Sequence, residues 1–157
     1  MNDKALREQL VKVLDWDEAH TPFDKAVAGI PVSKRGVVPN GWEYSLWQLV
    51  EHIRMAQADI LEFSVSARYK AKKWPDDYWP KSRAPRSAAA WTRSLARVRT
   101  DRKALQRLAR NPRLDLTAPI PHGTGQTCLR ELLLVAIHNS YHIGQIVALR
   151  RQLGIWQ

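Results

Sequence analysis

Apolar residues recur three or four positions apart, at helical spacing, in four long stretches of the chain. This spacing predicts helices over about 3–28, 45–69, 87–110 and 127–153. The first helix is expected to restart at Thr21-Pro22, because threonine can cap a helix and proline suits its first turn. The alternating pattern of a strand does not occur in this sequence. Four amphipathic helices joined by loops predict an all-α four-helix bundle.

Capping residues mark the ends of these expected helices. Ser45-Leu46-Trp47-Gln48 has the spacing of a capping box, in which each end side chain satisfies a backbone N–H of the first turn. Ser87 is expected to cap the third helix, and Gly154 to end the fourth. The intervening residues 29–41, 72–86 and 114–126 are rich in Pro and Gly or in mixed charges, which predicts loops.

The length of 157 residues suits one domain spanning residues 1–157, with its own core. The single cysteine, Cys128, excludes an intramolecular disulfide and a cysteine-based zinc site, so a metal site must use histidines and carboxylates. Met1-Asn2-Asp3-Lys4 lacks the apolar run of a signal peptide, and no stretch approaches the roughly 20 apolar residues of a membrane span. We therefore expect a cytoplasmic protein without membrane contact.

The net charge of +10 raises nucleic acid as a partner, because clustered Lys and Arg side chains bind phosphates. The basic residues are, however, interrupted by prolines and acids, and they do not alternate with aromatic residues as in a surface that reads bases. Nucleic acid is therefore not the expected partner, and the basic face of the third helix is interpreted as solvated.

The main chemical signal is a pair of histidines. His138 and His142 are four residues apart, so a helix places them one turn above each other, where both can bind one ion. The intervening residues lack the glutamate of a metalloprotease. His52 borders an apolar arc on the second helix and is the best candidate for a third ligand. The alternative is that these are surface or hydrogen-bonded histidines without a metal.

Residues 45–61 and 138–147 resemble the second and last helices of the DinB-like (YfiT-like) superfamily of metal-binding four-helix proteins. Ala19-His20, Tyr78-Trp79-Pro80 and the stretch 130–133 extend the resemblance over nearly the whole chain. It implies that His52, His138 and His142 hold Zn²⁺ or Ni²⁺ and leave positions open for water or substrate. It also implies a homodimer and a small-molecule substrate, for which a low-molecular-weight thiol is the leading candidate.

The sequence departs from the family at one position of this site. Many relatives have Asp immediately before the first histidine of the pair, where this chain has Ile137. The imidazoles must then be oriented by another acceptor, for which Asp59, Glu51 and a backbone carbonyl are the candidates.

Four further residues are predicted to line the pocket, three of them with a plainer alternative. His20 is a candidate proton carrier or a solvent-exposed helix-end residue, and Trp79 is a candidate lid or core filler. Gln145 lies one turn beyond His142, so it contacts either substrate or another helix, and Asp59 is the fourth.

Two classes of function remain open at this stage. The leading hypothesis is a metal-dependent enzyme, either a thiol-dependent S-transferase or a related hydrolase or isomerase. The alternative is a non-enzymatic metal-binding protein associated with stress or DNA damage, or a scaffold without turnover.

Overall fold

The computed structural model describes residues 3–15 and 17–156, so Met1, Asn2, Trp16 and Gln157 lie outside the described residues. The described residues form α-helices and no β-strand beyond an isolated bridge between Pro119 and Thr127. The helices are α1 (Asp3–Val13), α2 (Phe23–Val27), α3 (Leu46–Val65), α4 (Ala88–Arg110) and α5 (Cys128–Gln152), with short 3-10 turns η1 (Val32–Lys34) and η2 (Asp76–Tyr78).

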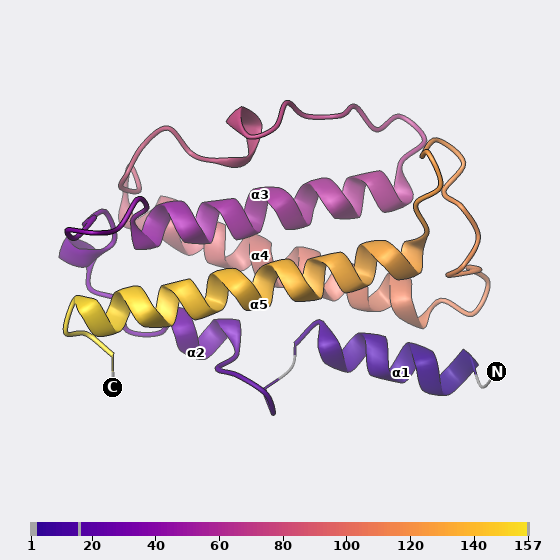
Figure 1. The fold of residues 1–157 in the computed structure, drawn as a ribbon, viewed down its shortest axis with the longest axis horizontal. Coiled ribbons are helices and arrows are strands. Elements are labelled where there is room, and N and C mark those ends of the chain that lie inside the picture. The colour runs from indigo at the N-terminus through magenta and orange to yellow at the C-terminus, as the bar shows by residue number, and fades with distance from the viewer. Residues whose placement is uncertain (1–2, 16, 157) are drawn as a thin grey trace.

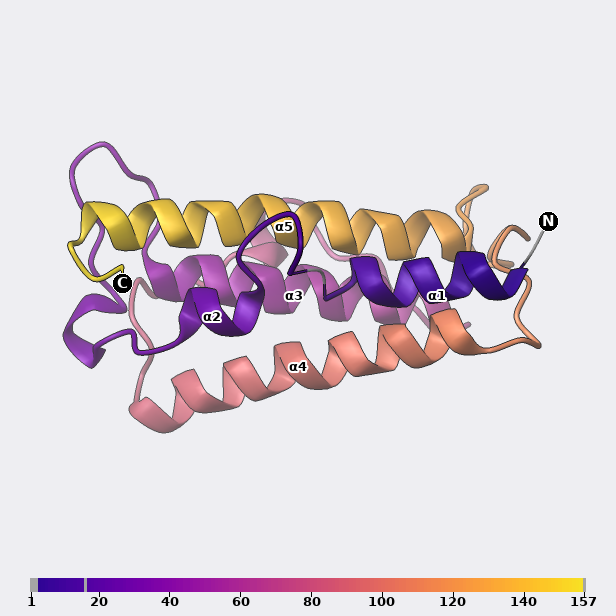
Figure 2. The ribbon, with the colours of Figure 1, turned by 90° about the horizontal axis from the view of Figure 1, so that it is seen from below.

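The three long helices α3, α4 and α5 lie side by side, and α1 and α2 follow one another along the remaining side, between α4 and α5 (Figures 1 and 2). The two short helices thus share the fourth position of the bundle. The prediction of an all-α four-helix bundle is confirmed. After α3, the connection of residues 66–87 runs back along this helix before α4 begins (Figure 1).

The prediction for the first helix was wrong in its extent. The helix ends at Val13, and α2 holds only five residues, with Pro22 in the N-cap position and no side chain capping it. The residues between them include Asp15, Asp17 and Glu18, which offer no apolar face to bury. Helix formation resumes at Phe23, whose side chain is buried in the core.

The predicted caps of the later helices are present. In the capping box of α3, Ser45 Oγ accepts a hydrogen bond from the Gln48 N–H (3.2 Å), and Gln48 Oε1 accepts one from the Ser45 N–H (3.1 Å). Ser87 caps α4 as predicted, and Thr127, at the start of the predicted fourth helix, caps α5. Gly154 has a φ of 68° directly after the C-cap of α5, a conformation that favours glycine. The end of α3 at Val65 is earlier than the predicted residue 69.

Two apolar clusters form the core, and the histidine pair lies between them along α5. One cluster contains Leu46, Leu49 and Ile146, and the other contains Leu105 and Leu132, all of them almost completely buried. The histidines are therefore held by rigid, well-packed parts of α3 and α5, which limits how far their side chains can move.

The outward face of α5 is unusually apolar. Leu133, Ile137 and Tyr141, spaced four residues apart, are 41%, 70% and 65% exposed. No stretch of the sequence is expected to resemble a membrane span, but α5 is long and apolar enough to cross a membrane, by length and composition. Half of its most apolar window is buried inside the bundle, as in the core helix of a globular protein. The prediction of no membrane contact therefore stays a prediction.

Candidate metal centre

The bundle brings three histidines from two helices together. His52 lies in the second turn of α3, and His138 and His142 lie one turn apart on α5, which packs against α3. One ligand nitrogen from each ring lies within 4.8 Å of the others, and Nε2 of His52 is 3.0 Å from Nε2 of His138. His52 and His142 are buried and His138 is half-buried, so the cluster is largely shielded from solvent.

The ring of His52 is clamped by the connection that follows α3. Its Nδ1 donates a hydrogen bond to the backbone carbonyl of Tyr78 (2.8 Å). Trp79 stacks on the imidazole with a centroid distance of 3.8 Å and an interplanar angle of 1°, and Tyr44 stacks on the other side of Trp79 at 3.9 Å. This arrangement fixes the position and the rotation of the His52 ring.

The other two rings are oriented by side-chain amides of α5. His142 Nδ1 lies 2.7 Å from Gln145 Oε1, and His138 Nδ1 lies 3.3 Å from Asn139 Oδ1. Asn139 is held in turn by Gln57, whose Oε1 accepts a hydrogen bond from Asn139 Nδ2 at 2.9 Å. The fully buried Gln57 amide then donates to the carbonyl of Val98 on α4 at 2.8 Å. Three helices therefore contribute to the orientation of His138.

These partners determine which ring nitrogen carries the proton. Each Nδ1 faces an oxygen acceptor, which favours a proton on Nδ1 and leaves the lone pair on Nε2. Two such lone pairs 3.0 Å apart, on His52 and His138, repel unless a cation lies between them. Two nitrogens bound to one tetrahedral zinc ion are roughly 3.3 Å apart. The donor set therefore fits a divalent transition-metal ion.

Burial keeps these imidazoles in the form that binds metals. It lowers the pKa of His52 and of His138. For His142, burial and then the neighbouring His138 lower the pKa to about 4. All three rings are consequently neutral near pH 7, and a neutral imidazole is the form that coordinates a metal ion.

A cavity of about 660 Å³ borders the cluster at His138. It extends between α3, the connection after α3 and the loop before α5, and aromatic rings form much of its wall: Phe63, Tyr69, Trp74, Tyr78 and His122. Arg130 and Glu131 lie along the same cavity and pair with each other. The cavity is large enough for a small organic molecule next to the histidines.

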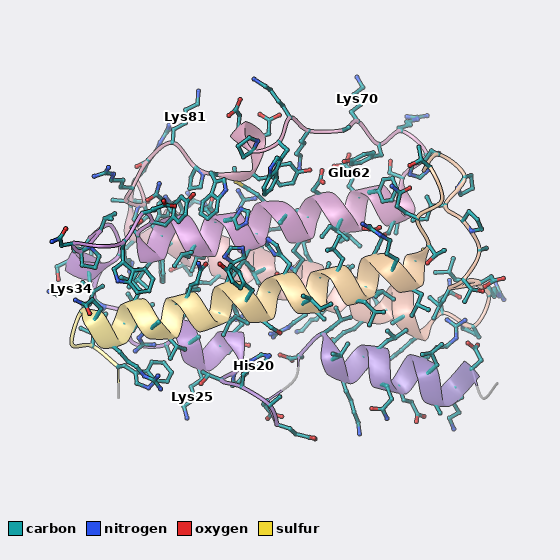
Figure 3. The ribbon with its side chains drawn as sticks, in the orientation of Figure 1. His20, Lys25, Lys34, Glu62, Lys70 and Lys81 are labelled. Carbon is teal, nitrogen blue, oxygen red and sulfur yellow. The ribbon has the colours of Figure 1, made fainter. Side chains whose placement is uncertain are left out.

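The structure brings two of the four predicted pocket residues to the histidine cluster and places the other two away from it. Trp79 stacks on His52 and Gln145 holds His142, so both contact the cluster. Asp59 lines the cavity without touching a histidine of the cluster. His20 lies on the α2 side of α5 (Figure 3), where its Nε2 bonds to Ser140 Oγ at 2.9 Å. It lines a separate cavity of about 20 Å³ and is not brought into the one that reaches His138.

The structure also shows which acceptors orient the histidines in a chain that has Ile137 and no aspartate at that position. Of the three candidates, the backbone carbonyl is the one used, by His52, whereas Glu51 binds Arg54 and Ser94. Ile137 itself is 70% exposed. The residues that sequence reasoning missed are Gln57, Asn139 and the carbonyl of Tyr78, and helical spacing gives no signal for Gln57, because a residue five positions after His52 does not share its face of α3.

Comparison with known proteins agrees with this arrangement. A family model described as the DinB superfamily matches residues 15–146, a range that contains all three histidines. Searches of curated proteins and of solved structures found no match. The match covers most of the chain and coincides with a helical bundle that carries a three-histidine cluster between two of its helices. The chain belongs to the DinB superfamily.

Proposed function

We propose that this protein is a divalent-metal enzyme that transfers, or acts with, a low-molecular-weight thiol on a small organic substrate. The observation that carries the proposal is the combination of three convergent imidazoles with an adjacent cavity of about 660 Å³. Three protein ligands leave at least one position open on Zn²⁺ or Ni²⁺, which is typical of catalytic sites. A bound ion supplies Lewis acidity, which lowers the pKa of a thiol or of water and so provides a nucleophile near neutral pH.

The residues of the chain would contribute binding and orientation. His52, His138 and His142 would hold the ion, and their Nδ1 partners keep the rings in place before substrate arrives. Such preorganisation limits the reorganisation needed during the reaction. The proposal assumes the cytoplasm, where low-molecular-weight thiols are kept reduced.

The walls of the cavity favour an apolar or ring-bearing substrate. Phe63, Tyr69 and Tyr78 offer flat surfaces for such a molecule, and Trp74 is 67% exposed beside them. A bound substrate would cover this indole and displace water from the space next to His138. The part of the tryptophan fluorescence that is lost in Trp74→Phe would therefore report binding, because the chain has seven tryptophans.

The test begins with the metal content of the purified protein. We expect about one Zn²⁺ or Ni²⁺ ion per chain in the wild type, and a loss of most of it in His52→Ala and in His138→Ala. His122→Ala is the matched control, because His122 lines the same cavity but bonds to the carbonyl of Phe63 and lies outside the cluster. It should keep the metal. An unchanged metal content in His138→Ala would refute the metal site.

Activity is tested separately with the same variants. A panel of low-molecular-weight thiols is incubated with small electrophiles, and loss of free thiol is measured. We expect turnover that depends on added metal and disappears in His52→Ala. A wild type that binds metal but turns over no pair in the panel would favour a non-enzymatic metal-binding protein. Salt-sensitive retention of DNA by the metal-free protein would favour the stress-associated or damage-associated alternative.

A further inference from the structure

Asp59 lies on the same face of α3 as His52, seven residues and two helical turns further on. Asp59 is only 5% exposed, and its carboxylate has three partners outside the helix. Tyr78 and Tyr69 donate their hydroxyls to Asp59 Oδ2 at 2.6 and 3.3 Å, and Lys72 Nζ lies 3.3 Å from Oδ1. All three partners belong to the connection after α3. This carboxylate therefore fastens the connection to the helix.

The bond to Tyr78 is the shortest of these contacts. It is short, and it joins a phenol to a charged acceptor that has been removed from water, conditions that strengthen a hydrogen bond. The Tyr78 hydroxyl is the donor of this bond, because a tyrosine phenol is protonated across the physiological pH range.

Tyr78 also makes the contact that orients His52. Its hydroxyl is bound to Asp59, while its backbone carbonyl accepts the hydrogen bond from His52 Nδ1 at 2.8 Å. The next residue, Trp79, stacks on the same imidazole. A single residue of the connection thus links the carboxylate to the imidazole, so the anchored hydroxyl restrains the residue whose carbonyl fixes the ring.

We propose that Asp59 is a positioning residue for the metal centre, which sets the orientation of His52 through Tyr78. The inference rests on the proposed function to the extent that His52 is a metal ligand. It adds that the Asp59 carboxylate acts on this ligand indirectly, through a tyrosine of the connection. The carboxylate itself does not contact the imidazole of His52. Asp59 also lines the substrate cavity, so the wall of the cavity and the orientation of His52 depend on the same carboxylate.

The decisive variants are Tyr78→Phe, which keeps the backbone carbonyl but removes the hydroxyl, and Asp59→Ala. Asp59→Asn keeps one acceptor oxygen and should fall between wild type and Asp59→Ala. The matched control is Tyr69→Phe, because Tyr69 donates to the same carboxylate but is not bonded to a histidine of the cluster. We expect Tyr78→Phe and Asp59→Ala to weaken Co²⁺ binding about tenfold, the usual cost of losing support behind a ligand. Tyr69→Phe should change it less than about twofold.

Two measurements separate positioning from a general loss of stability. Co²⁺ titration followed by visible absorption gives the affinity, and ¹⁵N NMR of the metal-free protein gives the tautomer of His52. We expect a single Nδ1–H tautomer in the wild type and in Tyr69→Phe, and a mixture in Tyr78→Phe. Lower melting temperatures in all three variants, with unchanged affinity and tautomer, would overturn the inference.

The same design distinguishes this inference from the proposed function. A wild type that binds no Co²⁺ would refute the metal site, and the tautomer of His52 would then decide alone whether Asp59 positions the ring. If Asp59→Ala does not fold, Tyr78→Phe and Asp59→Asn still give both measurements. If Asp59 acts through Tyr78, the Asp59→Ala/Tyr78→Phe double variant should weaken Co²⁺ binding only as much as the more damaging single variant. An additive effect would contradict action through Tyr78.

Discussion

Replacing Gln57 by Leu tests whether the buried amides behind His138 orient it. Gln57 is 1% exposed and makes two neutral hydrogen bonds, to Val98 and Asn139, at 2.8 and 2.9 Å. Each such bond contributes about 0.5–1.5 kcal/mol net, so we expect the free energy of unfolding to fall by about 1–3 kcal/mol. For a chain of this length each kcal/mol lowers the melting temperature by roughly 2–4 °C. Leucine has a similar volume, so a cavity adds little to this cost.

The effect on metal binding follows from Asn139. Without Gln57, the amide of Asn139 loses the partner that keeps its oxygen toward His138 Nδ1. We therefore expect Gln57→Leu to weaken metal binding about tenfold, measured by competition with a chelating dye. Gln106→Leu is the matched control, because Gln106 donates to the Val11 carbonyl between α4 and α1 (3.2 Å) and has no contact with a histidine of the cluster. Equal metal affinity in the two variants would refute the orienting role, whatever their melting temperatures.

Three further predictions concern the rest of the molecule. Leu105→Ala removes a fully buried side chain, so we expect a loss of about 2–5 kcal/mol in urea unfolding, with metal affinity unchanged; a loss below 1 kcal/mol would contradict the packing. Burial alone would raise the pKa of Asp24, but hydrogen bonds from Arg102 and Arg99 outweigh it and hold the pKa below its ordinary value. Above pH 5, Asp24→Asn should therefore be less stable than wild type, and by less than about 1 kcal/mol because these groups are partly exposed. The difference should vanish as the pH falls through the lowered pKa of Asp24, and a difference that persists at pH 2 would exclude this cause. Ile137→Glu places a charge on the exposed apolar face of α5, and we expect it to convert the predicted homodimer into a monomer in light scattering; a wild type that is monomeric would refute the dimer.

The parts of the fold that could be predicted from the sequence are those with local signals. Ser45 and Ser87 both cap helices, because a side-chain oxygen before an apolar periodic stretch satisfies the first free N–H groups wherever it occurs. The pattern predicts the restart near Thr21-Pro22 but not the length of the interruption between Val13 and Phe23. The residue at which a helix ends also depends on tertiary packing, which the local pattern does not contain.

In the candidate site, too, the residues with a local signal could be predicted and the others could not. His138 and His142 could be paired from their spacing, because four residues on one helix fix their separation. The position of His52 against them depends on the register of α3 and α5, and the family resemblance supplied what periodicity did not. Tyr78 escaped prediction because it acts through its backbone carbonyl, which every residue has and which no sequence pattern marks.

The acceptors behind the three histidines have a common chemical consequence. A carboxylate hydrogen-bonded to Nδ1 makes an imidazole a more basic ligand, whereas this site uses a backbone carbonyl and two side-chain amides, which are all neutral. Neutral acceptors fix the tautomer as well as a carboxylate does but pass less electron density to Nε2. An ion held by these rings would keep more of its positive charge and lower the pKa of a thiol or water further than it would with carboxylate support. The exposed Ile137 and the distant carboxylate of Asp59 therefore fit a centre in which orientation is provided without added negative charge.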